Sequence, residues 1–330
     1  MKDSERIKLE RIAEVFKNNY RLTHLFTRYL NLCPELITED MVKTMTEDSE
    51  LTKKEALVAL LSEIFSLDFS SAEDRALIRD YLPRAVRVLD TKPYYDDPYY
   101  KNVKIKNKKV GSFELKNESY KPYRGVICDD MQLLDDYKEI APIGFFTEEF
   151  FFPAVLEDGN EWMTLTPVDT DTSKDAISRA RGKVVTFGLG LGYFTYMASR
   201  KPEVESVTVV ELSKDVIKLF REEILPYFDH PEKVKIVNAD AFKYAEEVMP
   251  EENFDFAFVD TWRDASDGLP MYEKMKALEH LSENTEFSYW IEGFILSRKR
   301  SFAAARLIEM CESGNFDCKS YEEIIKEITV

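Results

Sequence analysis

The sequence lacks the features by which membrane-spanning, secreted and zinc-binding chains are usually recognised. No apolar run approaches the ~20 residues that cross a bilayer, and the first residues, Met-Lys-Asp-Ser-Glu-Arg, lack the apolar core of a signal peptide. The three histidines lie far apart, and no two of the four cysteines form a C-x-x-C pair. We therefore expect a cytoplasmic chain without a metal site and with reduced cysteines, which are Cys33, Cys128, Cys311 and Cys318.

Positive charge is also in short supply. The chain has 45 Lys and Arg against 62 Asp and Glu, which gives a net charge of −17. Since binding to nucleic acid depends on basic contacts to phosphate, DNA and RNA are not expected as substrates or partners. The local exception, Lys101 to Lys109, is interpreted as an edge strand that its lysines protect from aggregation. No membrane partner is expected either.

The 330 residues and 44% apolar content are sufficient for more than one folded domain. Residues 1–90 show a three-to-four spacing of apolar positions, which predicts a bundle of four to six helices. We interpret this region as a packing or dimerisation module, with a substrate lid as the alternative; a homodimer follows from the first interpretation. Residues 91–165 are predicted to form a β-rich connector, with a hairpin turning at Asp158-Gly159-Asn160, and residues 166–330 a third domain.

The stretch Lys183 to Phe194 organises this last domain. It starts as a buried strand and runs into glycines at alternate positions, Gly188, Gly190 and Gly192, before a helix begins. Glycine admits positive φ and close approach of a ligand, and a helix N-terminus offers free N–H groups. The pattern is G-x-G-x-G, because the last glycine of the dinucleotide fingerprint G-x-G-x-x-G falls on Tyr193. The loop therefore predicts a ligand cradle that does not fit NAD.

Three more strands follow at the spacing of a parallel sheet, and each ends near a carboxylate. They are Ser206 to Glu211, Val234 to Asp240, which precedes Ala241, and Phe254 to Asp260. Open parallel sheets bind ligands outside the carboxyl ends of their strands. A fifth strand is predicted at Phe287 to Glu292, with Glu292 facing the same cleft. Helices are predicted before and after this set, at Asp171 to Arg181 and Tyr272 to Leu281.

These residues resemble the class I S-adenosylmethionine (SAM)-dependent methyltransferases. The resemblance implies an α/β fold with a doubly wound, mostly parallel Rossmann-like sheet. It further implies that Gly188, Gly190 and Gly192 cradle the methionine part of SAM, that Glu211 binds the ribose, and that Asp240 with Ala241 meets the adenine. Asp260 is then expected to contact the cofactor and to act as a base or substrate ligand; the alternative is that it caps the following loop. The family often has an acidic residue where this chain has Thr186.

The acceptor is expected to be a small molecule. Relatives that methylate nucleobases or glutamine amides carry (Asp/Asn)-Pro-Pro-(aromatic) after the fourth strand, and this chain has Asp260-Thr-Trp-Arg. One alternative is aminopropyl transfer from decarboxylated SAM, as in the spermidine-synthase-like relatives of the fold, because an acidic cleft suits a polyamine. Those relatives typically show D-x-x-D, whereas Asp260 and Asp264 are one residue further apart. A non-catalytic SAM-binding protein is the other alternative.

Overall fold

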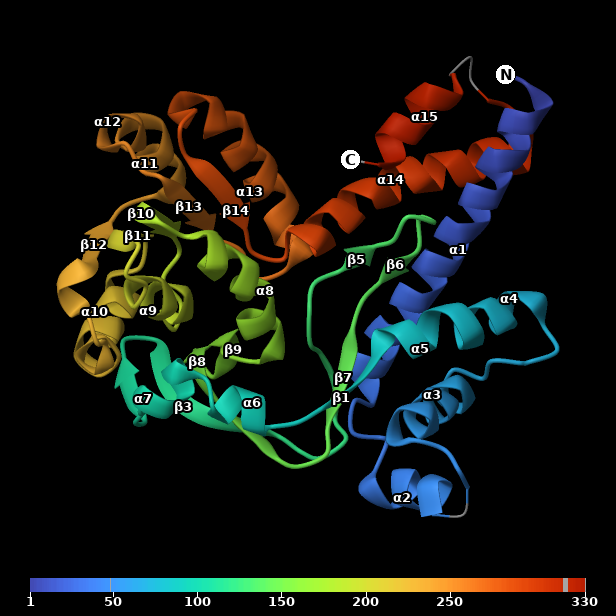
Figure 1. Cartoon of the computed structure of the whole chain (residues 1–330), viewed down its shortest axis with the longest axis horizontal. Coiled ribbons are helices and arrows are strands. Elements are labelled where there is room, and N and C mark those ends of the chain that lie inside the picture. Colours follow the sequence, from blue (N-terminus) through green and yellow to red (C-terminus); the bar gives the residue numbers. More distant parts are fainter. Residues whose placement is uncertain (48, 317–319, 330) are drawn as a thin grey trace. The chain divides into compact units, whose positions relative to one another are not determined.

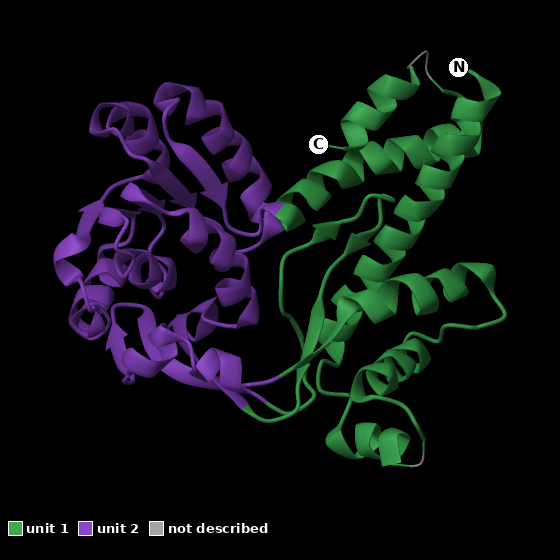
Figure 2. Cartoon of the chain, in the orientation of Figure 1, with its two compact units in different colours: residues 1–89, 121–149, 293–330 green, residues 90–120, 150–292 purple. Residues whose placement is uncertain are grey.

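The computed structural model describes residues 1–47, 49–316 and 320–329, so that Cys318 lies outside the described residues. The chain divides into two compact units, shown in Figure 2. Unit 1 contains residues 1–89, 121–149 and 293–330, and unit 2 contains residues 90–120 and 150–292. The boundaries of these two units differ from those of the predicted ranges 1–90, 91–165 and 166–330. The division into a helical domain, a β-rich connector and a third domain over those three ranges stays a prediction.

Unit 1 is mainly helical (Figure 1), as expected for the N-terminal region. Its strands form a three-stranded sheet of order β1-β7-β4 and a β5-β6 pair. Its elements are α1 (Asp3–Leu32), α2 (Glu39–Glu47), α3 (Lys53–Ile64), α4 (Ala72–Ala76), the π-helix Leu77–Tyr81, α5 (Leu82–Ala85), β1 (Val86–Leu89), β4 (Gly125–Ile127), β5 (Gln132–Leu133), β6 (Glu139–Ile140), β7 (Ile143–Phe146), α14 (Glu292–Ser313) and α15 (Tyr321–Ile328). Helix α14 starts at the last residue of unit 2.

A buried ion pair joins two of these elements. Arg300 of α14 donates from Nε to Oε1 of Glu139 in β6 at 2.7 Å, and the two side chains are only 4% and 8% exposed. Removing both charges from water is costly, so each charge depends on the other for compensation. The pair therefore fixes the position of α14 against β6 within unit 1.

Unit 2 is built on a five-stranded parallel sheet of order β12-β11-β10-β13-β14. Its strands are β10 (Gly182–Phe187), β11 (Val204–Glu211), β12 (Val234–Asn238), β13 (Phe256–Val259) and β14 (Glu286–Tyr289). The fold class predicted from the sequence is confirmed. The placement of Glu292 at the end of the fifth strand is wrong: β14 stops at Tyr289, Ile291 adopts a positive φ of 47°, and Glu292 begins α14.

Helices cover both faces of this sheet. Thr186 of β10 is paired with Phe258 of β13, and the Phe258 ring stacks 4.3 Å from Phe194 of α9 (Tyr193–Ser199). The next residue of β10, Phe187, has its ring 6.3 Å from Tyr244 of α11 (Ala241–Glu247). Because neighbouring residues of a strand point to opposite faces, α9 and α11 lie on opposite sides. The other helices of unit 2 are α6 (Lys92–Tyr95), α7 (Pro98–Asn102), α8 (Pro167–Arg179), α10 (Lys214–Glu223), α12 (Met249–Glu252), α13 (Ala265–Leu278) and the 3₁₀ turns Leu225–Tyr227, Pro231–Lys233 and Glu279–Ser282.

An antiparallel sheet of order β2-β3-β8-β9 completes unit 2. It contains β2 (Lys108–Val110), β3 (Phe113–Tyr120), β8 (Phe150–Glu157) and β9 (Asn160–Thr164). The hairpin predicted at Asp158-Gly159-Asn160 joins β8 to β9. The lysine-rich strand is shorter than expected, because only its end, β2, pairs at the sheet edge. Among the described residues, no helix is long and apolar enough to cross a bilayer.

We expect Arg300→Met to lower the free energy of unfolding by about 3–5 kcal/mol, because it leaves Glu139 charged, buried and unpaired. Urea denaturation followed by circular dichroism measures the change. The matched control is Lys43→Met, which removes an ion pair with Glu47 whose side chains are 61% and 63% exposed. The control should cost below about 1 kcal/mol. Equal effects of the two changes would contradict the stabilising role of the buried pair.

Candidate functional site

The glycine loop follows β10 directly and leads into α9. All three glycines have positive φ, at 96° for Gly188, 51° for Gly190 and 72° for Gly192. An ordinary side chain is strained in that region, which explains why glycine occupies each position. The loop is held to the sheet because the Gly188 N–H donates to the Val210 carbonyl at 2.9 Å.

The glycines serve different purposes. A Cβ on Gly188 would collide with the backbone carbonyl of Asp260, and a Cβ on Gly192 would collide with the ring of Phe220 in the core. At Gly190, a Cβ would meet the thioether of Met163. The first and third glycines therefore allow parts of the fold to pack closely, and Gly190 faces a displaceable side chain. That all three glycines cradle a ligand stays a prediction.

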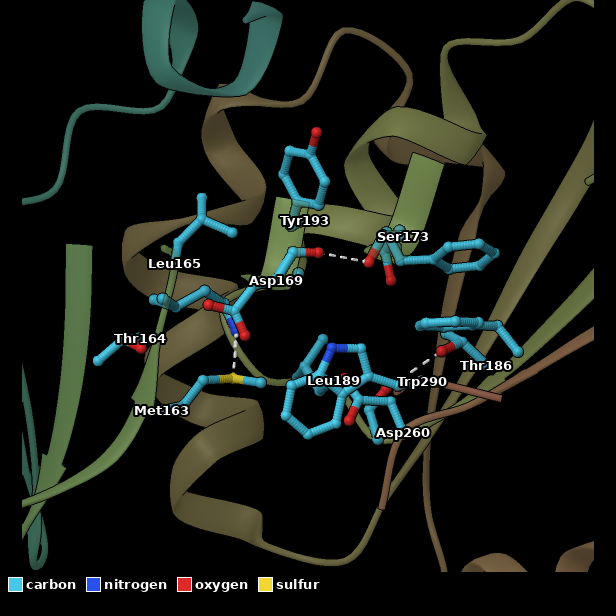
Figure 3. Close-up of a pocket in the computed structure, with 16 residues that line it drawn as sticks. Met163, Thr164, Leu165, Asp169, Ser173, Thr186, Leu189, Tyr193, Asp260 and Trp290 are labelled. Carbon is cyan, nitrogen blue, oxygen red and sulfur yellow. Dashed lines mark hydrogen bonds between the residues drawn. The ribbon is translucent and has the colours of Figure 1, made fainter. Parts of the chain in front are cut away.

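A small cavity lies beside this loop, at the carboxyl ends of β10 and β13 (Figure 3). Its free volume is about 30 Å³, room for little more than one or two water molecules. Sixteen residues line it, and none of these described residues is Lys, Arg or His: Met163, Thr164, Leu165, Asp169, Ser173, Thr186, Gly188, Leu189, Leu191, Gly192, Tyr193, Phe194, Thr195, Phe258, Asp260 and Trp290. Of the predicted site residues, Gly188, Gly192 and Asp260 thus meet at one cavity.

Asp260 stands at the tip of β13, two residues beyond Phe258, and so points to the α9 face of the sheet. Its backbone N–H donates to the Phe187 carbonyl at 2.8 Å. Its carboxylate has no hydrogen-bond or ion-pair partner in the described part of the chain. Burial raises its pKa well above the usual range, and the charges of Asp169 and Glu211 raise it further. A carboxylate in this setting favours a proton or a bound cation.

Asp169 is the second carboxylate of the cavity. It lies in the first turn of α8, where Oδ2 accepts from the N–H and the hydroxyl of Thr166 at 2.7 and 2.8 Å. Burial raises its pKa to about 6, against the opposing effect of these hydrogen bonds. Two acids thus share a small cavity in unit 2 without a cation to balance them.

The other predicted residues lie outside the cavity lining. Glu211 is next to it, because it accepts from the N–H of Leu189 at 3.2 Å and from the N–H of Ser213 at 2.7 Å. Burial raises the pKa of Glu211. Asp240 caps α11 by accepting from the N–H groups of Phe242 and Lys243, both at 3.0 Å, and Ala241 is the first residue of that helix. Within the described residues, no three acidic, His or Cys side chains are grouped as metal ligands.

Sequence reasoning missed Asp169, Met163, Tyr193 and Trp290 as cavity residues. It started the helix before β10 at Asp171, whereas α8 begins at Pro167. The capping pattern Thr166-x-x-Asp169 with proline at the first helical position would have located this start. Met163 reaches the loop from the antiparallel sheet, and local patterns do not report such a contact.

Comparisons with known proteins give only partial similarities to solved structures. No protein-family model and no curated protein matches the sequence. Among solved structures, the chain is similar to spermidine synthase from Thermotoga maritima, at 18% identity and a TM-score of 0.33 over 47% of this chain and 56% of that chain. A spermidine synthase in complex with the transition state analogue AdoDATO is 19% identical, with a TM-score of 0.34 over 48% of this chain and 57% of that chain. A probable spermidine synthase from Corynebacterium glutamicum is 20% identical, with a TM-score of 0.28 over 34% of this chain and 44% of that chain. Each match therefore spans about half of the spermidine synthase chain.

Gly188→Ala is expected to destabilise the chain by more than about 3 kcal/mol, because the new methyl group meets a backbone carbonyl at a positive φ. The matched control is Gly159→Ala, at a φ of 84° with no atom within 4 Å of the added Cβ. The control has the backbone strain without the collision, so about 1–2 kcal/mol is expected. Urea denaturation compares them. Equal losses would mean that the approach of Gly188 to Asp260 is not tight.

Asp169→Asn should change how stability depends on pH. The pKa of Asp169 is raised in the folded chain, so ionisation destabilises the wild type as pH rises from about 4 to about 6. The variant cannot ionise there, so its stability relative to wild type should increase over this window, by about 2–3 kcal/mol, and stay level above it. Denaturation at pH 4, 5, 6 and 7 measures this. The control is Asp158→Asn, because Asp158 is exposed. If the difference in unfolding free energy between Asp169→Asn and wild type did not change with pH, the pKa of Asp169 would not be raised.

Proposed function

We propose that this chain is a transferase that moves an aminopropyl group from decarboxylated SAM to a small amine. The observation that carries the proposal is the cavity at the tips of β10 and β13, where Asp169 and Asp260 have no cation beside them among the lining residues. A carboxylate partly removed from water is stabilised by a proton or by a counter-charge. A ligand that brings positive charge and no carboxylate is therefore the best match.

The donor is chosen by its charge. Decarboxylated SAM carries a sulfonium and an ammonium, whereas intact SAM adds a carboxylate that would lie among like charges. Aromatic side chains of Tyr193, Phe258 and Trp290 also line the cavity and favour a cation near their faces. A further carboxylate, Asp97, accepts from the Tyr193 hydroxyl at 3.0 Å, which extends the acidic surroundings toward an amine acceptor.

The remaining contacts follow from the resemblance to SAM-dependent enzymes. Gly190 would lie against the sulfur-bearing chain, and Glu211 would bind the ribose hydroxyls with the lone pairs that Leu189 and Ser213 leave free. Asp240 and Ala241, at the start of α11, would meet the adenine. A cytoplasmic location and a homodimer stay predictions from the sequence.

The residues then have defined tasks in the transfer. When bound, the donor supplies a carbon that its sulfonium has already activated. The nitrogen lone pair of the acceptor amine forms the new bond to that carbon as the carbon–sulfur bond breaks, and the electron pair stays on sulfur as a neutral thioether. Asp260 first takes the proton from the acceptor ammonium, which frees this lone pair, and passes the proton to water. Asp169 balances the positive charge, and the cavity walls align the two reactants.

Methyl transfer from intact SAM is the second candidate, and the loop after β13 favours it. Asp264 does not supply the second acid of a D-x-x-D pair, because it caps α13 by accepting from the N–H of Ser266 at 2.6 Å. Under this alternative the acceptor is still a small molecule, and Asp260 still lies nearest to the transferred group.

We expect purified full-length chain to convert decarboxylated SAM and putrescine or spermidine into 5′-methylthioadenosine and the extended polyamine, measured by mass spectrometry. Asp260→Asn should lower kcat/KM by about a hundredfold or more, because it removes the proton acceptor. Asp158→Asn, in the exposed β8–β9 turn, is the matched control and should leave kcat/KM unchanged.

The donor decides between the two candidates. Turnover with intact SAM that yields S-adenosylhomocysteine, and none with the decarboxylated donor, would replace aminopropyl transfer by methyl transfer. Absence of both binding and turnover with either donor would leave the proposed activity without support.

A further inference from the structure

Met163, which lines the cavity, covers the middle glycine of the loop, Gly190. It belongs to β9, and its Sδ accepts from the N–H of Leu191 at 3.1 Å (Figure 3). A Cβ on Gly190 would collide with Sδ and Cε of Met163, so the thioether lies directly on the Gly190 backbone. The end of this side chain therefore occupies the surface that the middle glycine leaves open.

The cavity is too small for a nucleoside with a sulfur-bearing chain. Its free volume of about 30 Å³ admits one or two waters, so some lining group has to move before a ligand enters. Gly188 meets backbone and Gly192 meets the buried ring of Phe220, neither of which yields easily. Methionine is unbranched, with three rotatable bonds, and is adaptable in this way. Of the groups that lie against the three loop glycines, Met163 is thus the one best able to move.

The chemistry of the side chain matches the ligand. Met163 ends in CH₂–S–CH₃, the same group that 5′-methylthioadenosine carries at its 5′ carbon. The N–H of Leu191 already donates to a thioether sulfur, and it would do the same for the nucleoside after the side chain has moved.

We propose that Met163 occupies the subsite of the ligand's sulfur-bearing chain and determines how tightly thioether nucleosides bind. The inference rests on the proposed function, since it takes the ligand to be an adenosyl compound. Only molecules in which Met163 has moved away can bind the ligand, so the apparent affinity is reduced in proportion to the open fraction.

The test follows the methionine methyl groups of the full-length chain by NMR after ¹³C-methyl labelling. Titration with 5′-methylthioadenosine should shift the Met163 methyl signal strongly, and Met197, half-buried in the core of unit 2, should shift little. Adenosine, which has no sulfur, is the control ligand and should leave Met163 in place. Met163→Leu and Met197→Leu assign the two signals.

Calorimetry gives an independent measurement. Met163→Ala should bind 5′-methylthioadenosine about tenfold more tightly than wild type, the gain expected if the wild-type site is open about one-tenth of the time. Met163→Leu restores the bulk and should keep wild-type affinity or weaken it. Met197→Ala is the matched control for a lost methionine and should leave affinity unchanged.

The outcomes separate the two proposals. If wild type and Met163→Ala bind the thioether nucleoside equally and the Met163 methyl does not shift, the role of Met163 is overturned and the proposed function stands. If neither protein binds 5′-methylthioadenosine or decarboxylated SAM, the proposed function fails and this inference fails with it. Tighter binding by Met163→Ala together with a shifted methyl signal supports both.

Discussion

The close approach of Gly188 to the carbonyl of Asp260 is the constraint on which the candidate site depends. The parallel pairing of β10 with β13 ends one residue before each of them, at Phe187 and Val259, and the Asp260 N–H donates to Phe187 at 2.8 Å. A side chain on Gly188 would separate the two strand ends. Because it is absent, the glycine loop and the Asp260 carboxylate share one small cavity, and the chemistry of the site follows from that proximity.

The acids of this cavity lower the stability of the folded chain. Asp260 has a raised pKa because it is buried near Asp169 and Glu211, and the pKa of Asp169 is raised to about 6 by burial. Backbone N–H groups and the Thr166 hydroxyl hold Asp169 and Glu211 in position without supplying full positive charge. Carboxylates held in this way lack a full counter-charge, and a bound cation would supply it.

Much of unit 2 could be predicted from the sequence, and the reasons are local. Buried parallel strands appear as continuous apolar runs, and the glycines and carboxylates at their ends lie at recognisable spacings. The extent of β14 was misjudged because Trp290 and Ile291 continue the apolar run, although the backbone turns at Ile291. Contacts between distant segments determine two further features. One is the approach of Met163 to the glycine loop, and the other is the grouping of residues 121–149 and 293–330 with the N-terminal helices. No periodicity within a short stretch reports such contacts.

The assignment of two acids remains the most informative difference from the expected pattern. Asp264 is used to begin α13, where it accepts from the N–H of Ser266, so the loop after β13 contributes only Asp260 to the cavity. The second carboxylate comes instead from Asp169 in α8, which precedes the first strand of the sheet in the chain. A pair of acids can therefore form across two elements without the D-x-x-D spacing. What matters for a cation is the position of the carboxylates in the folded chain. The absence of the D-x-x-D motif therefore does not exclude a pair of carboxylates at one cavity.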